Sequence, residues 1–286
     1  MLSQAKPFSR PVFVSTINSC ETLLYCSWKG CTMFNTRYRY KYGFVLCFFV
    51  FNLIFFTRQH VSAEDMDRVQ NSLKLIPSFR FGDSRAALTE VETFIRSTND
   101  IEKRAWLENE FVRILNSDVT YDCIDFICRQ LRVIGTDISI PVLEKLLLDN
   151  KTSDMACYAL LPNSSPAAGK ALRDALKKTT GKARIGIIYS LGERKDHECV
   201  DELVSLIFDE STKPAPDDAK PEEMEACKIA VETAIASIRA LASIGGKQAG
   251  HALSRAKVHE NQAVRTAASP AFLKWADTMV QNDNGE

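Results

Sequence analysis

Four short stretches in the C-terminal half of the chain occupy equivalent positions in one repeating unit. They are 132–135 (RVIG), 158–161 (YALL), 189–192 (YSLG) and 242–245 (ASIG). An apolar residue follows eleven positions after the last member of each stretch, at Leu146, Leu172, Leu203 and Ala256. A repeat of this size is typical of stacked helical hairpins, in which each unit covers the apolar face of the next. The repeat therefore predicts an all-α fold, a right-handed α-solenoid of stacked antiparallel helix pairs.

Apolar residues recur at helical spacing in nearly every segment from residue 65 onward. The expected helices cover 65–77, 84–97, 101–115, 120–134, 140–149, 152–161, 166–178, 182–191, 197–208, 221–244, 247–257 and 261–279. Short polar side chains that accept first-turn N–H groups are expected to cap four of the helix starts. They are Asp83, Asp100, Ser139 and Ser165. Glycine is expected at four helix ends, namely Gly135, Gly181, Gly192 and Gly245.

One segment interrupts the helical pattern. Residues 209–223 (DESTKPAPDDAKPEE) are acidic and contain three prolines and almost nothing apolar. Such a composition cannot bury surface, so we expect a mobile loop. The last members of the four stretches are separated by 26, 31 and 53 residues. Because the repeat resumes in phase after the long interval, we interpret the segment as an insertion; a domain boundary is the alternative.

The N-terminal region has the pattern of a secretory signal. Basic residues 37–42 precede the apolar run 43–56, and a small-x-small motif ends at Ala63. Fourteen residues are fewer than the approximately 20 that a membrane-spanning helix needs. We expect export with cleavage after Ala63; an uncleaved membrane anchor at 43–56 is the alternative. Translation from Met33, or a long disordered leader over 1–32, would account for the residues before the basic patch.

The charge balance changes when this leader is set aside. Residues 1–63 hold seven of the 36 Lys and Arg residues and one of the 36 Asp and Glu residues, which leaves 29 basic and 35 acidic residues. An acidic excess is a poor match for nucleic acid, which binds basic surfaces. The remainder also lacks a polybasic run for anionic lipid. We therefore expect no nucleic-acid partner and no stable membrane insertion after signal cleavage.

Five cysteines remain beyond residue 63, an odd number that leaves at least one thiol free. They are Cys123, Cys128, Cys157, Cys199 and Cys227. No C-x-x-C motif occurs among them, so zinc and thioredoxin-like sites are not indicated. Cys157 and Cys199 fall where the repeat requires a small core residue, and free cysteine behaves as a small hydrophobic residue. We expect buried thiols; a Cys123–Cys128 bridge is disfavoured because the two side chains point to different faces of a helix.

Three longer segments carry a resemblance to a known family. They are 128–147 (CRQLRVIGTDISIPVLEKLL), 156–176 (ACYALLPNSSPAAGKALRDAL) and 188–207 (IYSLGERKDHECVDELVSLI). These segments resemble the short HEAT repeats of PBS-lyase HEAT-like proteins. The phrases C-R-Q-L-x-x-I-G-T and Y-A-L-x-P resemble exported HEAT-repeat proteins of planctomycete and verrucomicrobial-type bacteria. The resemblance covers roughly 120–280 and implies an α-solenoid that serves as a protein-interaction scaffold.

On this basis the chain divides into six segments. We expect a leader and signal at 1–63, N-terminal helical or capping repeats at 64–119, HEAT-like repeats at 120–208, the acidic proline-rich loop at 209–223, further HEAT-like repeats at 224–281 and a disordered tail at 282–286.

Two enzyme families share such repeats and imply alternative functions, a di-iron hydroxylase and a bilin lyase. In deoxyhypusine hydroxylases a His-Glu dyad stands five to six residues before the Leu of each repeat. The equivalent positions here are Cys128-Arg129, Asp154-Met155, Ile185-Gly186, Ile238-Arg239 and Thr266-Ala267. None is His-Glu, and the dyads His197-Glu198 and His259-Glu260 lie off this register, so we expect both histidines to be exposed. Bilin attachment is suggested by fold similarity alone, which does not imply function. We expect no catalysis, no metal and no cofactor.

The second helix of each pair in a helical solenoid lines its concave side. The candidate partner-binding residues on that register are Arg129, Arg132, Asp154, Tyr158, Tyr189 and Arg239. Tyr158 and Tyr189 occupy the same place in adjacent repeats, so we expect them side by side, with Arg132 extending the stripe. Tyr and Arg are favoured at binding hot spots; the alternative is that the tyrosines pack between repeats. The sequence thus predicts an exported scaffold for a protein or peptide partner, and a purely structural accessory to an exported enzyme is the alternative.

Overall fold

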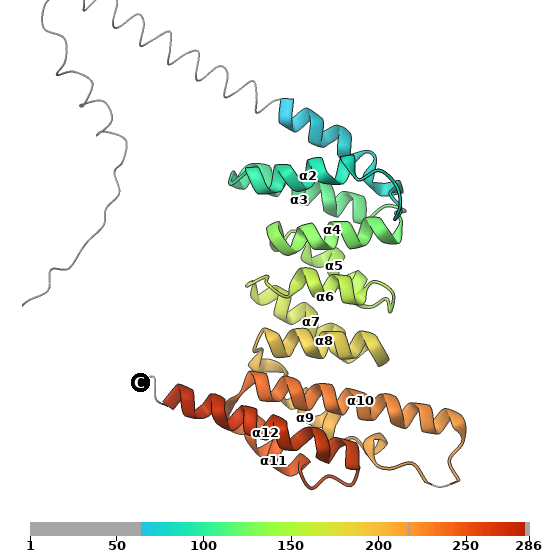
Figure 1. Ribbon diagram of the computed structural model, residues 1–286, viewed down its shortest axis with the longest axis vertical. Coiled ribbons are helices and arrows are strands. Elements are labelled where there is room, and N and C mark those ends of the chain that lie inside the picture. Colours follow the sequence, from blue (N-terminus) through green and yellow to red (C-terminus); the bar gives the residue numbers. More distant parts are fainter. Residues whose placement is uncertain (1–63, 217, 284–286) are drawn as a thin grey trace, which may run out of the picture. The chain divides into compact units, whose positions relative to one another are not determined.

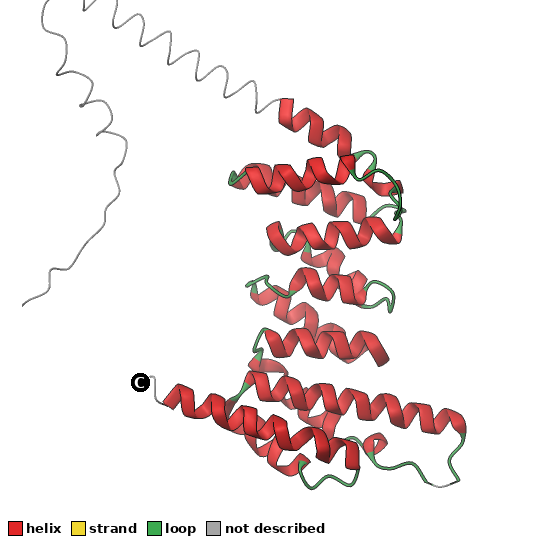
Figure 2. Cartoon of the chain, in the orientation of Figure 1, coloured by secondary structure: helices red, strands yellow, loops and turns green. Residues whose placement is uncertain are grey.

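Every regular element in the described part of the chain is a helix (Figure 2). The computed structural model describes residues 64–216 and 218–283, with side chains as far as Met279. The all-α prediction is confirmed for these residues. No helix in these two ranges combines the length and apolar character that a membrane span requires. The expected leader, the apolar run 43–56 and the cleavage site after Ala63 lie outside the described residues.

The helices follow the predicted order closely. An initial helix covers 64–73 and the 3-10 turn η1 covers Ile76–Ser78. The α-helices that follow are α2 (Ala86–Ser97), α3 (Ile101–Leu115), α4 (Tyr121–Ile134), α5 (Ile140–Leu147), α6 (Ser153–Leu160), α7 (Pro166–Lys178), α8 (Gly181–Glu193), α9 (Val200–Ile207), α10 (Pro221–Ile244), α11 (Gly246–Ala256) and α12 (Gln262–Asp283). Two further 3-10 turns are η2 (His197–Cys199) and η3 (Glu210–Thr212). Helix α12 extends two residues into the segment expected as a disordered tail.

The helices are arranged in pairs and layers (Figure 1). From α3 onward, each odd-numbered helix packs on the even-numbered helix that follows it. The even-numbered helices from α2 to α12 also pack on one another in chain order, while α5 contacts α7 and α9 contacts α11. Helix α3 packs on α4, so the segment boundary expected between residues 119 and 120 falls within one helix pair.

The core runs through all the pairs rather than lying at one centre. Buried apolar side chains form one cluster from Val69 to Ala271. The repeat positions Leu172, Leu203 and Ala256 are fully buried, whereas Leu146 packs partly buried at the edge of the cluster. Each fully buried leucine contributes about 2 kcal/mol by leaving water. The same position of the repeat therefore contributes to the core in successive pairs.

Two of the four expected helix caps are present. The side chains of Asp100 and Ser165 accept hydrogen bonds from first-turn N–H groups of α3 and α7. Asp83 instead accepts from the backbone N–H three residues earlier, which closes a turn ahead of α2. Ser139 is buried and its hydroxyl donates to the carbonyl three residues earlier. The predicted caps at Asp83 and Ser139 are therefore wrong, because tight turns occupy both side chains.

Two of the four glycines expected at helix ends have other positions. Gly135 and Gly245 follow the last residues of α4 and α10, as predicted. Gly181 is the first residue of α8, with φ +57°, and does not close α7. Gly192 lies inside α8, where a Cβ would stand 2.8 Å from the Cα of Ala240 on α10. At Gly192 close helix packing explains the glycine, and helix termination does not.

The acidic segment joins α9 to α10 inside one compact unit of the chain. It is not purely a surface loop, because Thr212 is only 1% exposed and donates to the Ile207 carbonyl at 3.2 Å. Helix α10 begins at Pro221, so the end of the expected loop is helical. The prediction that 209–223 buries nothing is therefore wrong, since the 3-10 turn anchors it; the insertion interpretation fits this compact unit better than a domain boundary does.

The five cysteines beyond residue 63 are free thiols, and four of them are buried. Cys157 and Cys199 occupy the small core positions that the repeat predicts. Burial raises the pKa of Cys123, Cys128, Cys157 and Cys199 to about 12. Cys227, on α10, is half-buried and its Sγ donates to the Lys213 carbonyl. The buried-thiol expectation is confirmed for all but Cys227.

Candidate functional site

All six candidate residues lie on even-numbered helices. Arg129 and Arg132 belong to α4, Asp154 and Tyr158 to α6, Tyr189 to α8 and Arg239 to α10. We call the surface that these residues share, on α4, α6, α8, α10 and α12, the even-helix face. Two large side chains are exposed on this face: Tyr158 is 45% exposed and Tyr189 is 62% exposed.

Arginine side chains from α4 hold the ring of Tyr158. The guanidinium carbon of Arg132 lies 4.3 Å from the centre of the ring, and its Nη1 donates to the Tyr158 carbonyl at 3.0 Å. Arg129 is farther from the ring centre, at 6.0 Å, and its Nε donates to Asp125 at 2.8 Å. Such cation–π contacts contribute about 0.5–1 kcal/mol at an exposed site. Tyr158 is therefore oriented by α4.

Helices α6 and α8 approach closely about one turn before the two tyrosines. A Cβ on Gly186 would stand 2.7 Å from a carboxylate oxygen of Asp154, so the carboxylate lies directly over the glycine. Tyr189 is one turn further along α8 and points to solvent. Tyr158 and Tyr189 thus share one face of neighbouring helices, and each ring has a different environment.

Three hollows open on the even-helix face. The α4–α6 hollow, of about 270 Å³, is lined by Tyr121, Asp125, Cys128, Arg129, Asp154, Met155 and Tyr158. The α8–α10 hollow, of about 350 Å³, is lined by Ile185, Tyr189, Gly192, Glu193, Ala236, Arg239, Ala240, Ser243 and Lys274. The α10–α12 hollow, of about 930 Å³, is lined by Ile235, Arg239, Ala242, Asn261, Gln262, Ala263, Thr266, Ala267, Pro270, Ala271 and Lys274.

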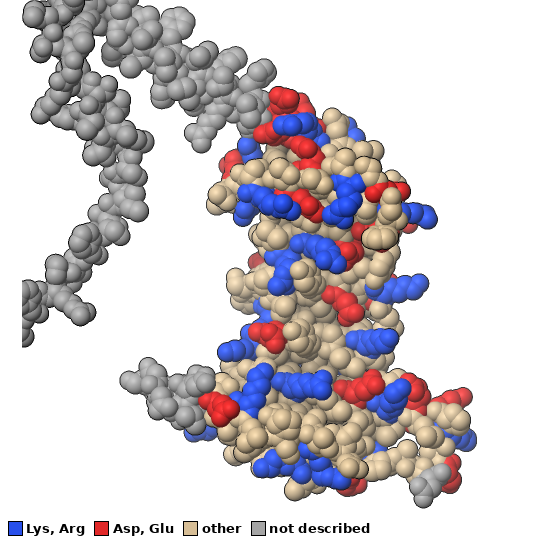
Figure 3. All heavy atoms as spheres, in the orientation of Figure 1, with Lys and Arg blue, Asp and Glu red and all other residues tan. Residues whose placement is uncertain are grey.

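Charges of both signs are interspersed over α4 to α10 in Figure 3, with uncharged surface between them. On the α4 side, Arg129 is neutralised by its ion pair with Asp125. Around α10 and α12, no carboxylate of the described residues lies within ion-pair distance of Arg239 or Lys274. The Nζ of Lys274 donates to the Ser243 hydroxyl at 2.9 Å. Arg239 and Lys274 thus place positive charge without a carboxylate partner at the α10–α12 end.

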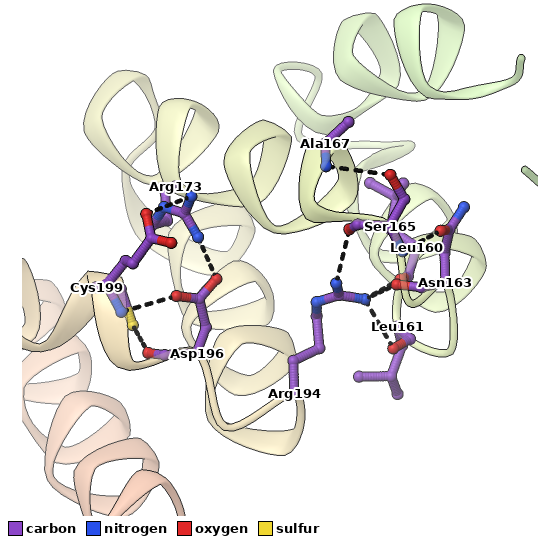
Figure 4. A network of polar contacts seen from close by, with 10 residues as sticks. Leu160, Leu161, Asn163, Ser165, Ala167, Arg173, Arg194, Asp196 and Cys199 are labelled. Carbon is purple, nitrogen blue, oxygen red and sulfur yellow. Dashed lines mark hydrogen bonds and ion pairs between the residues drawn. The ribbon is translucent and has the colours of Figure 1, made fainter. Parts of the chain in front are cut away.

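A part-buried polar cluster fixes the turn between α6 and α7 (Figure 4). The guanidinium of Arg194, just after α8, donates to the carbonyls of Leu160, Leu161 and Ser165 at 2.9, 3.2 and 3.3 Å, and also to that of Asn163. Burial lowers the pKa of Arg194. The last carbonyls of a helix lack partners within the helix, so one side chain of the next pair satisfies the end of α6.

Two further turns are held by charged side chains from neighbouring helices. Arg173 of α7 bridges Asp196 and Glu198 at 2.5 and 2.9 Å, which holds the turn between α8 and α9 (Figure 4). Glu108 of α3 is fully buried and accepts from the backbone N–H groups of Thr136 and Ser139 at 2.7 and 3.1 Å. These contacts set the spacing of the even helices and therefore the even-helix face.

Neither histidine of the two His-Glu dyads lines any of the three hollows. His197 is exposed in η2, as expected. His259 is half-buried, 6.0 Å from the ring of Phe208, and its Nε2 lies 3.3 Å from the Thr212 hydroxyl. The expectation of an exposed His259 is wrong because the η3 turn covers it, and burial lowers its pKa. Within the described residues, no group of three or more His, Cys, Asp and Glu side chains could hold a metal ion.

Four residues of the face were missed by the sequence reasoning: Tyr121, Asp125, Glu193 and Lys274. The first two precede Arg129 by eight and four residues on α4, and Glu193 follows Tyr189 by four residues on α8. Helical neighbours at this spacing share a face, so extending Arg129 by two turns and Tyr189 by one turn would have found the first three. Lys274 lies on α12, which holds none of the candidates. The register positions Thr266 and Ala267 do line the α10–α12 hollow.

The described residues define a class of protein rather than an individual one: an all-helical chain built of packed pairs, with tyrosine and arginine exposed along one face. Neither a protein-family model nor a curated protein sequence matches this chain. Its function must therefore be argued from its own residues.

Proposed function

We propose that this chain is a right-handed α-solenoid of HEAT-like helix pairs that binds a protein or peptide segment through its concave, even-helix face. The pairing of each odd helix with the next even helix supports the solenoid. So does the burial of apolar residues at equivalent positions of successive pairs. In such repeat arrays each unit contacts only its neighbours, which leaves one long surface for a partner.

The observation that carries this proposal is the exposure of Tyr158 and Tyr189 at equivalent turns of neighbouring helices. Tyrosine contributes a large contact area and loses little conformational entropy on binding. Stacking by Arg132 already restricts the Tyr158 ring, which lowers the entropy cost further. If the tyrosines served only to pack repeats, Tyr189 would not leave 62% of its surface in water.

We propose binding without catalysis, metal or cofactor. The positions equivalent to iron-binding dyads carry arginine, aspartate and small or apolar residues, and several of these line the hollows. His197 and His259 stand at turns and line none of these hollows. An iron site needs several converging His and carboxylate ligands, and the described residues contain no group of three or more such side chains that could hold a metal ion.

We also propose that the mature protein is exported and begins after Ala63. The support is the basic, apolar and small-x-small order of residues 37–63. Burial of Cys123, Cys128, Cys157 and Cys199 suits an oxidising compartment, since it keeps those thiols from exchange. N-terminal sequencing of protein recovered outside the cytoplasm should start at Glu64; a start upstream of residue 43 would contradict cleavage.

Site-specific photo-crosslinking tests the proposed face directly. A photoreactive phenylalanine at position 189 should crosslink one defined partner in the cells that produce the protein. The same group at Val258, which is 81% exposed in the turn after α11, is the matched control. Equal yields of the same product from both positions would contradict the proposal.

The partner identified in this way then allows a quantitative test. Replacing Arg132, Tyr158 and Tyr189 by Ala should weaken its binding by about thirtyfold or more, since one hot-spot side chain is worth about 2 kcal/mol. Circular dichroism should show an unchanged helical content, and Val258→Ala should bind like the wild type. Unchanged affinity of the triple variant would rule out this face as the binding surface.

A further inference from the structure

The α10–α12 hollow, at about 930 Å³, is larger than the α4–α6 and α8–α10 hollows. Its floor is made of small or compact apolar residues, namely Ile235, Ala242, Ala267, Pro270 and Ala271. Small side chains on two adjacent helices leave room for a bulky side chain from outside. Moving such a side chain out of water onto this floor is favourable at roughly 25 cal/mol per Å² of apolar surface buried.

Two cations stand at the rim of this floor. Arg239 and Lys274 line both the α10–α12 hollow and the adjoining α8–α10 hollow, so they stand between the two. Arg239 is exposed, and its guanidinium has no carboxylate partner among the described residues. Lys274 is held in place by its hydrogen bond to Ser243. Glu193 lines the α8–α10 hollow but not the α10–α12 hollow.

We propose that the α10–α12 hollow binds an acidic peptide segment of the partner. One bulky apolar side chain of the segment sits on the alanine and proline floor, and neighbouring carboxylates contact Arg239 and Lys274. This inference rests on the proposed function and specifies the partner chemistry at one end of the same face.

The chemistry of the hollow favours an acidic peptide over nucleic acid. A guanidinium matches a carboxylate through two parallel hydrogen bonds. Nucleic acid requires a broad basic surface along its backbone, whereas this rim has two cations and residues 64–286 have more acidic than basic residues. The apolar floor would also contribute nothing to a phosphate backbone. An acidic peptide with a leucine or aromatic side chain uses both the floor and the rim.

Selection from a random dodecapeptide library displayed on phage, against the full-length protein, tests this proposal. The enriched peptides should carry Asp or Glu next to Leu, Phe, Tyr or Trp. A fluorescein-labelled synthetic copy of the most enriched peptide then serves as the probe in fluorescence polarisation. Its affinity should fall as salt rises from about 50 to 500 mM, because salt screens exposed charges.

Charge reversal at the rim gives the decisive comparison. Arg239→Glu and Lys274→Glu should each lower the affinity for the probe by about tenfold. A probe with its carboxylates replaced by lysine should bind the double variant better than it binds the wild type. Thr266→Trp, at an exposed site over the floor, should block binding without changing a charge. Lys247→Glu, at an exposed position of α11, is the matched control and should leave binding unchanged.

The outcomes separate this inference from the proposed function. One outcome is that the peptides lose affinity for the variant with Arg132, Tyr158 and Tyr189 replaced by Ala but keep it for Arg239→Glu. That result would overturn the acidic-peptide site and leave the proposed function standing. Peptides unaffected by either set would overturn both. No enrichment, enrichment of neutral or basic sequences, or a dimer in solution that dissociates on Arg239→Glu would each contradict an acidic peptide as the occupant.

Discussion

Two glycines of α8 allow close approach of a different neighbour on each side. A Cβ on Gly192 would stand 2.8 Å from the Cα of Ala240, which belongs to the backbone of α10. A Cβ on Gly186 would meet a carboxylate oxygen of Asp154 at 2.7 Å, at the end of an exposed and flexible side chain. The distances are similar, but the atoms that would have to move are very different.

The stability of two alanine variants should reflect this difference. Gly192→Ala should lower the free energy of unfolding by about 1–3 kcal/mol, because α8 and α10 must separate. The cost of that separation exceeds the gain of about 1 kcal/mol in helix propensity. Gly186→Ala, the matched control, should be neutral or slightly stabilising, since Asp154 can turn away. Urea denaturation measures both. Equal effects of the two substitutions would show that the α8–α10 distance does not depend on Gly192.

The glycines also show what the sequence could not reveal at this scale. Gly135, Gly192 and Gly245 share one register position, and glycine is common after helix ends. Only Gly135 and Gly245 follow a helix end in the structure, because α8 continues through Gly192 and packs against α10. The pattern identifies where a backbone is constrained, but neighbours distant in sequence decide whether the constraint is a turn or a contact.

At the scale of elements, the turns depend on side chains from the next pair or the previous one. Arg194 closes the end of α6 from a position after α8, and Glu108 of α3 binds the turn between α4 and α5. These contacts join residues about 30 positions apart, whereas a helical repeat is evident from spacings of three, four and eleven. The helices could therefore be predicted from the sequence, and the polar contacts that align them could not.

Removal of the Arg194 side chain should measure how much its hydrogen bonds to the α6–α7 turn stabilise the fold. Arg194→Ala should lower the free energy of unfolding by about 2–3 kcal/mol, because several carbonyls lose a charged donor in a part-buried place. Arg194→Lys should recover only part of this loss, since one ammonium cannot reach all four carbonyls. Arg129→Ala, which removes an exposed ion pair, is the control and should change stability by less than about 1 kcal/mol. A loss of stability no greater than that of the control would mean that water donates to the carbonyls of the turn equally well.

At the scale of the whole molecule, four buried thiols mark three of the helix pairs. Cys123 and Cys128 lie in α4, Cys157 lies in α6 and Cys199 stands just before α9; all four are buried, with pKa values raised to about 12. Their reaction with an alkylating reagent at neutral pH requires the surrounding helices to open. The half-buried Cys227 needs no such opening.

Native alkylation followed by peptide mass spectrometry should therefore label Cys227 first among the cysteines beyond residue 63. The other four should react only at the rate at which their helix pair opens, and all should react quickly in denaturant. The order of labelling among the four would map local stability along the array. Rapid native labelling of Cys157 would contradict the packing of α6 described above.

The face itself was only partly predictable. The register correctly brought Arg129, Asp154, Tyr189 and Arg239 onto even-numbered helices. The size of the α10–α12 hollow, however, depends on how α12 packs against α10, and Lys274 reaches Ser243 from 31 residues away. Periodicity predicts which residues share a face, but the space between two helices depends on every side chain that separates them.

The pairwise packing has a consequence for how proteins of this design change in length. Because α7 and α8 meet mainly the helices before and after them, duplication of one such hairpin would create only interfaces of a kind already present. The gene could gain or lose hairpins in single recombination events and still encode a folded product. Selection for a longer or shorter ligand would then act on copy number, while the composition of each hairpin stayed the same.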